Sequence, residues 1–247
     1  MDKVYRFPEW VFHYDKTDST MSDAINIISE ITPPPDNFVI IADEQIKGIG
    51  RNNNTWISPL GGLWFTYCLK SQSVKHQVTI ILGLYLHKIL TKHYPSLAQR
   101  LLIKWPNDIV IDGRKLSGIL VQAHSGYLCI GIGINTNIDE LILNEGMEPI
   151  SLKQIFSFQV SDSSLAKSFV ASFQEVCKVF TEINLSDYVT QINNLLYGFN
   201  HRIKFDTGKD LLEGICRGIS DEGTILIEDN EGIICPYYSG SIVSFGD

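Results

Sequence analysis

The stretch LLIKWPNDIVIDGRKLSGILVQAHSGYLCIGIGI, residues 101–134, decides the fold class of this chain. Its apolar runs are interrupted by Asp112-Gly113 and Ser125-Gly126, and dipeptides of this type favour two-residue hairpin turns. The pattern predicts strands at 101–105, 109–111, 116–121 and 128–134. Consecutive strands joined by tight turns pair as hairpins, so we expect a mixed, largely antiparallel sheet.

Segments on either side of this stretch predict helices and further strands. Asp18-Ser19-Thr20 opens a helical pattern, and Thr20 and Asp23 have the spacing of a capping box. Apolar periodicity predicts helices at 78–89, 165–180 and 185–196, and strands at 38–42 and 63–69. Together with the hairpins, these elements predict an α+β fold with helices packed on the sheet.

The sequence pattern changes at about Gly198. From there, short apolar runs alternate with glycine turns at Gly208, Gly223 and Gly232. Such spacing is typical of a small β-barrel of about 50 residues. We therefore expect two domains, an α+β domain at 1–198 and a small all-β domain at 199–247.

Composition excludes several classes of protein. The chain has 247 residues, with 20 Lys+Arg against 28 Asp+Glu and a formal charge of −8, which argues against a broad phosphate-binding surface. No apolar run reaches the roughly 18 residues of a membrane helix, and the start has no secretory h-region. The five cysteines are scattered without a C-x-x-C pair. We expect a cytoplasmic protein with reduced thiols, no membrane association and no cysteine metal site.

Two common nucleotide-binding signatures are absent from the sequence. There is no G-x-x-x-x-G-K-[ST] motif, and neither Gly48-Ile49-Gly50 nor Gly131-Ile132-Gly133 is followed by a glycine three residues later. A P-loop NTPase or a Rossmann dehydrogenase is therefore not expected.

Three segments set polar residues beside glycines in regions that otherwise look like core. They are the loop 45–56 with Arg51, the charged stretch 104–120 with Lys104, Asp108 and Lys115, and the glycine-rich strand 131–137. Closely spaced glycines allow a ligand to approach the backbone, and arginine binds carboxylate or phosphate. The competing interpretations are a plain surface loop, a hairpin with a solvated basic turn, and a β-bulge, respectively.

The three segments together resemble the biotin protein ligase family. That family has D-S-T-N, then Q-x-x-G-R-G-R with W-x-S-P-x-G, then K-W-P-N-D with K-x-x-G-I-L, then G-x-G-I-N. The corresponding stretches here occur in the same order at 18–21, 45–51, 56–61, 104–108, 115–120 and 131–135. The C-terminal segment is similar to the family's small SH3-like β-barrel, so the resemblance covers nearly the whole chain.

The resemblance implies a two-step reaction. Biotin and ATP give biotinyl-5′-AMP, and the biotin then passes to a lysine of a biotin carboxyl carrier domain. Two anions meet in the first step, so a cation is needed where negative charge accumulates. The resemblance gives this role to Lys115, with Arg51 second, and makes Asp108 a base or orienting group for the lysine. Mg²⁺ would accompany ATP, with no all-protein metal site.

The resemblance also implies the ligand-binding residues. The residues implied for biotin are Ser19, Thr20, Met21, Gln45, Gly48, Ile49, Gly50, Arg51, Lys115, Gly118, Gly131 and Gly133. Those implied for ATP are Arg51, Asn54, Trp56, Lys104, Asn107, Lys115 and Asn135. The chain departs from the family at Met21, Ile49 and Asn54, and Tyr67 stands where a small hydroxyl residue is expected.

Only about 17 residues precede Asp18, too few for the helix-turn-helix of longer family members. We therefore expect the short form, without DNA binding, and a homodimer is a family-level expectation. Two alternatives remain: a lipoate or octanoate ligase or transferase of the same fold, and a non-catalytic, biotin-binding regulatory protein.

Overall fold

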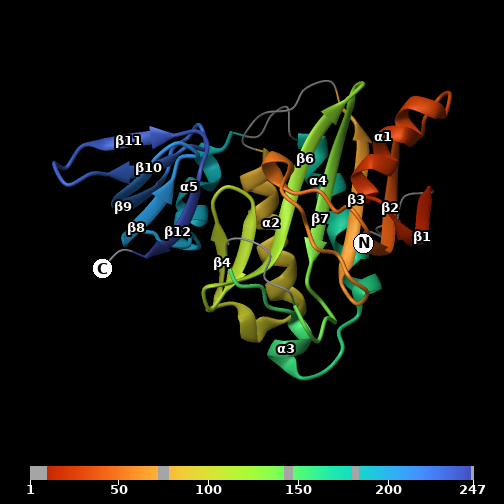
Figure 1. The fold of residues 1–247 in the computed structure, drawn as a ribbon. Coiled ribbons are helices and arrows are strands. Elements are labelled where there is room, and N and C mark those ends of the chain that lie inside the picture. Colours follow the sequence, from red (N-terminus) through yellow and green to blue (C-terminus); the bar gives the residue numbers. More distant parts are fainter. Residues whose placement is uncertain (1–9, 72–77, 142–146, 180–183, 246–247) are drawn as a thin grey trace, which may run out of the picture. The chain divides into compact units, whose positions relative to one another are not determined.

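The computed structural model describes residues 10–71, 78–141, 147–179 and 184–245 (Figure 1). These residues form two compact units. The first contains residues 10–71, 116–141 and 149–179, and the second contains residues 78–115, 147–148 and 184–245.

The first unit is built on a mixed sheet. Its strands, in hydrogen-bonded order, are β1 (Val11–Thr17), β2 (Asn37–Gln45), β3 (Leu63–Lys70), β7 (Tyr127–Ile134) and β6 (Arg114–His124), the first two residues of β6 belonging to the second unit. β1 runs parallel to β2, and the other neighbours are antiparallel. The predicted mixed, largely antiparallel sheet is therefore confirmed, although β1 itself was not predicted.

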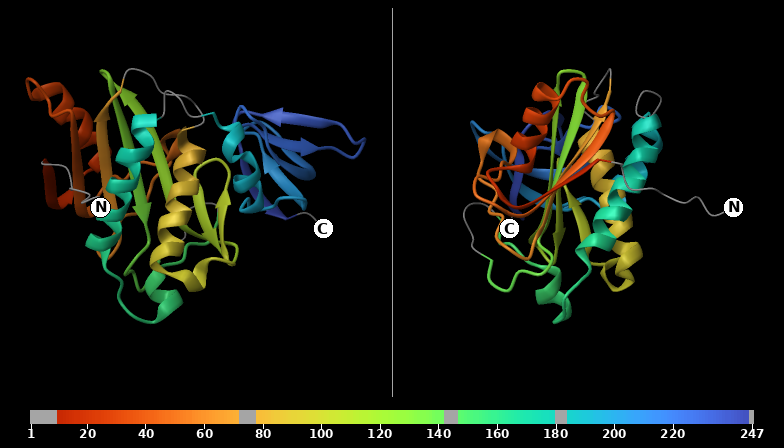
Figure 2. Two further views of the ribbon diagram at one scale, coloured as in Figure 1. Left: turned by 180° about the vertical axis from the view of Figure 1, so that it is seen from behind. Right: turned by 90° about the vertical axis from the view of Figure 1, so that its right-hand side faces the viewer.

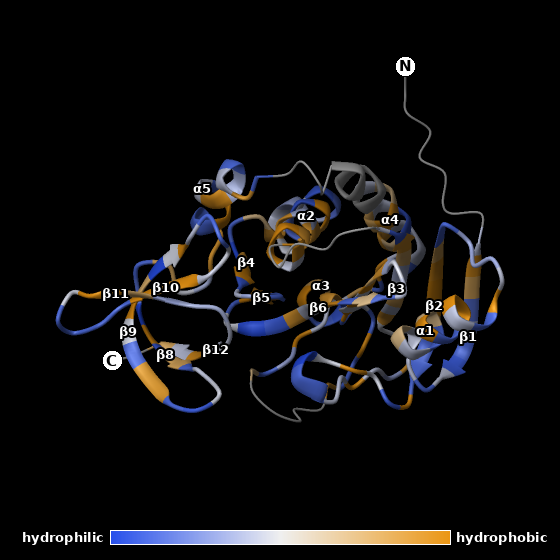
Figure 3. Cartoon of the chain, turned by 90° about the horizontal axis from the view of Figure 1, so that it is seen from above, coloured by the Kyte–Doolittle hydropathy of each residue, from blue (hydrophilic) through white to orange (hydrophobic). Residues whose placement is uncertain are grey.

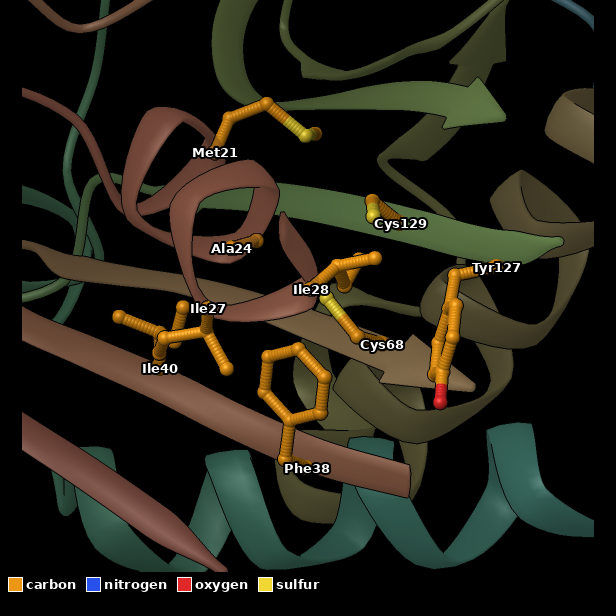
Figure 4. Packing of buried hydrophobic residues seen from close by; sticks show 9 residues of the cluster. All are labelled: Met21, Ala24, Ile27, Ile28, Phe38, Ile40, Cys68, Tyr127 and Cys129. Atoms are coloured by element: carbon orange, nitrogen blue, oxygen red, sulfur yellow. The ribbon is translucent and has the colours of Figure 1, made fainter. Parts of the chain in front are cut away.

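Helices cover both faces of this sheet. α1 (Thr20–Glu30) and α4 (Asp162–Val179) lie on opposite sides of it (Figure 2). Ala24, Ile27 and Ile28 of α1 pack on Phe38 and other apolar residues in one cluster (Figure 4). Figure 3 shows the hydrophobic colour along β2, which contributes to this core. The apolar periodicity predicted both helices, with Phe180 lying outside the described residues.

Side chains of β3 alternate between the two helices. Cys68 belongs to the cluster under α1, whereas Phe65 stacks on Phe169 of α4 with ring centroids 6.0 Å apart. Since successive side chains of a strand point to opposite faces, Trp64 and Thr66 share the α1 face with Cys68. Tyr67 therefore points to the α4 face.

The short helix α3 (Leu152–Phe156) also belongs to the first unit and was not predicted. It begins with a capping box in which the Ser151 hydroxyl accepts from the Gln154 backbone N–H and the Gln154 side chain accepts from the Ser151 N–H. Five residues are too few to show a helical period, so the cap was the available signal.

The second unit combines a helix, a hairpin and a separate sheet. α2 (Val78–His93) packs on the hairpin of β4 (Leu101–Lys104) and β5 (Asp108–Ile111). The buried ring of His87 lies with Nε2 3.0 Å from the Leu101 carbonyl oxygen. After α5 (Ser186–Asn194), the chain enters the C-terminal sheet.

The C-terminal sheet has five antiparallel strands. In order they are β11 (Ile234–Tyr237), β10 (Ile225–Glu228), β9 (Leu211–Ile219), β8 (Arg202–Asp206) and β12 (Ser241–Phe245). Gly208, Gly223 and Gly232 lie between strands with φ of +86°, +81° and +82°, a conformation that glycine adopts easily. The glycine turns were therefore predicted correctly, whereas the SH3-like barrel and the domain boundary at 198 stay predictions.

Trp105 connects the hairpin of the second unit to this sheet. Its indole N–H donates to the Gly223 carbonyl at 2.9 Å, and its ring lies 6.1 Å from that of Phe205. Ile103 of β4 also exchanges backbone hydrogen bonds with Leu195 and Tyr197, at 2.8 and 2.9 Å. The C-terminal sheet and the segment before it thus hold the chain on both sides of Lys104.

No helix within the described ranges is long and apolar enough to cross a membrane.

Candidate functional site

Three of the charged candidates meet at the hairpin of the second unit. Lys104 and Asp108 are cross-strand partners at the ends of β4 and β5. Nζ of Lys115 lies 2.9 Å from Oδ2 of Asp108. The Lys104 residue is 6% exposed, and the side chains of Lys115 and Asp108 are 27% and 12% exposed. Two lysines therefore share the neighbourhood of one largely buried carboxylate, and burial strengthens the attraction between such charges.

The second carboxylate oxygen of Asp108 is available to a donor. Oδ1 is buried and has no hydrogen-bond partner among the residues that the structure describes. A buried carboxylate oxygen without a donor is costly, typically about 1–3 kcal/mol. A ligand that brings an N–H or O–H group would remove this cost.

The remaining residues of this region hold the hairpin and the start of β6. Asn107 is half-buried in the turn between β4 and β5. Asp112 and Gly113 have φ of +49° and +72°, as the predicted hairpin turn requires. The Lys115 N–H donates to the Glu148 carbonyl at 2.7 Å, and Arg114 forms an ion pair with the Glu148 side chain at 3.4 Å.

In the first unit, the loop 45–58 is closed by backbone hydrogen bonds. The Trp56 N–H donates to the Gly48 carbonyl at 2.8 Å, and the Gly50 N–H donates to the Asn54 carbonyl at 2.7 Å. A Cβ on Gly48 would lie 2.3 Å from the Trp56 carbonyl oxygen, so only glycine fits there. The loop predicted from its glycines is thus an ordered hairpin, in which Ile49 and Arg51 are half-buried and Asn54 is exposed.

A hydrogen-bonded series of polar side chains, which we call the polar chain, lies at the start of α1. The amide oxygen of Gln45 accepts from the backbone N–H and the hydroxyl of Thr20, at 2.9 and 3.1 Å. The Thr20 hydroxyl also lies 2.9 Å from that of Thr66. On the other side, Nε2 of Gln45 donates to the Ser58 hydroxyl at 2.8 Å. Thr20, Ser58 and Thr66 are all buried.

The capping box expected at Thr20 and Asp23 is wrong. α1 begins at Thr20 with Ser19 as its N-cap, and the cap makes no side-chain hydrogen bond. The Thr20 hydroxyl is used for Gln45 and Thr66, while Asp23 accepts from Thr17 at 2.7 Å. Ser19 and Thr20 are both buried polar residues at a helix N-terminus, where N–H groups favour an acceptor ligand.

Three predicted glycines gather on the α1 face of the sheet. Gly118 and Gly133 are cross-strand partners, and Gly131 is the partner of Thr66. All three glycines are only half-buried, although they lie in the interior of β6 and β7. Without side chains here, other groups can approach the sheet backbone closely.

Met21 and Trp56 lie beside two of these glycines. A Cβ on Gly131 would lie 2.9 Å from Cε of Met21, and one on Gly133 would lie 2.5 Å from Nε1 of Trp56. Met21 is buried with the core cluster, and Trp56 meets Trp64 edge to face at 6.3 Å. Asn135, at the end of β7, is 4% exposed, and its N–H donates to the Leu116 carbonyl at 3.0 Å.

Thr66 is a buried polar residue beside Thr20 that the sequence interpretation did not name. The expected small hydroxyl was assigned to position 67, but Tyr67 points to the α4 face, and Thr66 bonds to Thr20 on the α1 face. The alternation of β3 could have revealed this, since Trp64, Thr66 and Cys68 must share a face.

The structure brings the predicted residues together in two sets. In the first unit, Thr20, Met21, Gln45, Gly48, Trp56, Gly118, Gly131 and Gly133 are linked by the contacts above. In the second unit, Lys104, Asn107, Asp108 and Lys115 surround one hairpin. Lys47 of the first unit forms an exposed ion pair with Asp18 at 2.8 Å, an arrangement that contributes little to stability.

The comparisons with known proteins agree on one family. The model of the biotin/lipoate A/B protein ligase family matches residues 15–139. The bifunctional ligase/repressor BirA of Escherichia coli is 28% identical over 214 residues, covering 82% of this chain and 64% of that protein. The biotin--[acetyl-CoA-carboxylase] ligase of Paracoccus denitrificans is 30% identical over 129 residues, covering 50% of this chain and 52% of that protein.

A solved structure of a similar protein covers nearly the whole chain. The biotin protein ligase from Aquifex aeolicus, in complex with biotin and ATP, has a TM-score of 0.81 and 25% sequence identity. The similarity covers 97% of this chain and 98% of that one. By contrast, this chain spans about two thirds of the length of the Escherichia coli relative.

Proposed function

We propose that this chain, which belongs to the biotin/lipoate A/B protein ligase family, is an ATP-dependent biotin protein ligase. Biotin carboxylate attacks the α-phosphate of ATP, which gives biotinyl-5′-AMP and releases pyrophosphate. The amine of a carrier lysine then attacks the mixed anhydride and releases AMP. The names of the relatives support biotin as the acyl group.

The pair of Lys115 and Asp108 is the observation that carries the proposal. Adenylation brings a carboxylate and a phosphate together, and a fixed ammonium stabilises the charge that develops between them. Lys115 is held for this role by the 2.9 Å contact with Asp108. Arg51 is the second cation that we assign to the reacting groups.

Asp108 has a separate role in the second step. An ordinary lysine has a pKa near 10.4, so the carrier amine must lose a proton before it attacks. Oδ1 of Asp108 is buried without a partner among the described residues, which supports its use as the acceptor of a hydrogen bond from that amine. We assign Asp108 to orienting the amine and taking its proton.

We assign biotin to the polar chain and the glycine face of the first unit, and the family resemblance adds Lys115 as the partner of its carboxylate. Thr20 and Gln45 supply polar groups, and the lack of side chains at Gly118, Gly131 and Gly133 lets a bicyclic ligand, with Met21 and Trp56 beside it, come close to the sheet. The remaining residues that we assign to biotin are Ser19, Met21, Gly48, Ile49, Gly50 and Arg51.

We assign the nucleotide to aromatic, cationic and amide side chains. Trp56 offers a half-buried aromatic ring, and Lys104 offers a nearly buried cation beside Asp108. The remaining residues that we assign to ATP are Arg51, Asn54, Asn107, Lys115 and Asn135. The described residues contain no group of three acidic, histidine or cysteine side chains that could hold a metal. We propose that Mg²⁺ accompanies the ATP phosphates, whose charge it screens.

The partner of the second step is a biotin carboxyl carrier domain. The name of the Paracoccus denitrificans relative, biotin--[acetyl-CoA-carboxylase] ligase, supports a carboxylase as the protein that receives biotin. We further propose a cytoplasmic location, an SH3-like arrangement of the C-terminal sheet, a domain boundary near residue 198 and no DNA binding. A homodimer is also proposed.

One assay tests the proposed function. The protein is mixed with ATP, Mg²⁺ and either biotin, lipoate or octanoate, and acyl-adenylate is measured by mass spectrometry. An apo carrier domain is then added, and its gain in mass is measured. Biotinyl-adenylate and a biotinylated carrier are expected. Lipoyl or octanoyl products alone would assign the chain to the other acyl groups of its family, and no adenylate with any acid would refute ligase activity.

A further inference from the structure

The buried hydroxyl of Ser58 is hydrogen-bonded to the side-chain amide of Gln45. Gln45 is half-buried, so it can touch both the protein interior and a bound molecule. Ser58 is 3% exposed and reaches Gln45 through the 2.8 Å hydrogen bond from Nε2. Its effect on a ligand is therefore exerted through Gln45.

The direction of each hydrogen bond in the polar chain follows from the Thr20 backbone N–H, which can only donate. The Thr20 backbone N–H lies 2.9 Å from one end of the Gln45 amide, so that end must be the oxygen. The Thr20 hydroxyl also donates to this oxygen, which leaves the Thr66 hydroxyl to donate to Thr20. The other end of the amide is then Nε2.

Ser58 is the last member of the polar chain and accepts a hydrogen bond from Gln45. Its own hydroxyl proton is directed to the Trp56 carbonyl, 3.1 Å away, so its oxygen is available to accept from Nε2 of Gln45. The donors thus run in one direction, from Thr66 through Thr20 and Gln45 to Ser58. Bonds in such a row strengthen one another.

One N–H of the Gln45 amide takes no part in the polar chain. An amide nitrogen has two protons, and the described residues offer an acceptor for one of them, at Ser58. The second N–H is therefore left as a donor for a ligand. A flipped amide would present an oxygen to the same ligand atom and repel an acceptor.

We propose that Ser58 is a positioning residue for biotin recognition: together with Thr20, it holds the Gln45 amide so that an N–H meets an acceptor atom of biotin. This inference deepens the proposed function and rests on it for the identity of the ligand. Ser58 touches no reacting group in this account, so it affects binding of the acid and not the chemical step.

The kinetic test uses Ser58→Ala, with adenylate formation measured against biotin and against ATP. Without this acceptor the Gln45 amide is held only by Thr20, so its nitrogen is placed less firmly, and KM for biotin is expected to rise about tenfold, the factor that corresponds to one modest hydrogen bond. The values of kcat and KM for ATP are expected to stay within about twofold. Ser58→Thr keeps the hydroxyl and is expected to restore KM for biotin in part.

The matched control is Ser29→Ala. Ser29 lies on the exposed side of α1, and its hydroxyl bonds to the Ile25 carbonyl at 2.8 Å, away from Gln45. It loses the same group without altering the chain of donors, so its kinetic constants are expected to match those of the unmodified protein.

A double-mutant cycle separates positioning from general damage. If Ser58 acts through Gln45, adding Ser58→Ala to Gln45→Ala produces no further rise in KM for biotin, since no amide is left to orient. Additive effects of the two changes, an equal rise of KM for ATP, or a Ser58→Ala variant with unchanged KM for biotin would each overturn the proposal.

A ligand-free measurement keeps the inference independent of the reaction. The side-chain amide of Gln45 is identified in a ¹⁵N spectrum by its loss in Gln45→Ala. Its protons are expected to exchange slowly with solvent in the unmodified protein and quickly in Ser58→Ala. Equal exchange in the two proteins would refute the fixed amide, whereas an unmodified protein with a protected amide but no biotinyl-adenylate would refute the proposed function alone.

Discussion

Replacing Lys115 by alanine is expected to abolish most adenylate formation. The change removes the ammonium 2.9 Å from Asp108, the cation that we assign to the transition state of the first step. Removal of one preorganised charge typically costs 100-fold or more in rate, or roughly 2.7 kcal/mol or more. Single-turnover formation of biotinyl-5′-AMP at saturating biotin and ATP measures this loss without a carrier.

The same change has a separate, smaller effect on stability. The Asp108 side chain is 12% exposed, so it would keep its charge in a largely buried place without Lys115. An uncompensated buried group costs roughly 1–3 kcal/mol, and each kcal/mol lowers Tm by about 2–4 °C for a protein of this size. A folded variant with a modestly lower Tm is therefore expected.

Lys153→Ala is the matched control. Lys153 has nearly the same side-chain exposure, 26%, and an ion pair to Asp139 at 2.7 Å, but Asp139 is 74% exposed. Its loss is expected to change neither adenylate formation nor Tm appreciably, because exposed pairs contribute little. Adenylate formation by Lys115→Ala within fivefold of the unmodified rate, or an equal loss in Lys153→Ala, would refute the assignment of Lys115.

Three further changes test other contacts. Trp105→Phe keeps an aromatic ring but loses the N–H bond to Gly223, and urea unfolding should show a loss of about 1–2 kcal/mol; an unchanged midpoint would contradict this. Gly133→Ala places a Cβ 2.5 Å from Nε1 of Trp56, so adenylate formation should fall at least about tenfold by displacement of the indole, and a rate equal to that of the unmodified protein would argue against that crowding. Burial lowers the pKa of His87 below its ordinary value of 6.5, so the folded protein binds this proton at lower pH than the unfolded chain does. The free energy of unfolding should therefore fall as pH drops below about 6.5. In urea titrations His87→Gln should flatten this pH dependence, and an equally steep dependence in the variant would exclude His87 as its source.

The sequence predicted the sheet well because its turns are local. Asp112-Gly113 and Ser125-Gly126 adopt the positive φ angles that the hairpins need, and each turn fixes the pairing of its own strands. β1 lacks such a signal. It pairs in parallel with β2 across an intervening helix, and five of its seven residues are exposed, so no clear apolar pattern marks it.

The candidate site was harder to predict where a side chain can bond either to its own helix or to a residue distant in sequence. Thr20 and Asp23 have the spacing of a cap, yet Thr20 bonds to Gln45 and Thr66, which are distant in sequence. Local spacing cannot show a competing partner across the fold. Thr66 was missed for a related reason, since the face of a strand residue depends on register, and an error of one position moves it to the other side of the sheet.

The indole of Trp105 has a consequence for any attempt to shorten the protein. Its hydrogen-bond acceptor, the Gly223 carbonyl, lies 118 residues further along the chain, in the C-terminal sheet. A fragment that ends near residue 198 would leave this N–H and the face packed on Phe205 to water. The turn between Lys104 and Asp108 would lose the contacts that hold its first residue, Trp105, in place. Protein engineers who want a minimal catalytic fragment should therefore retain the last fifty residues or rebuild the surface around Trp105.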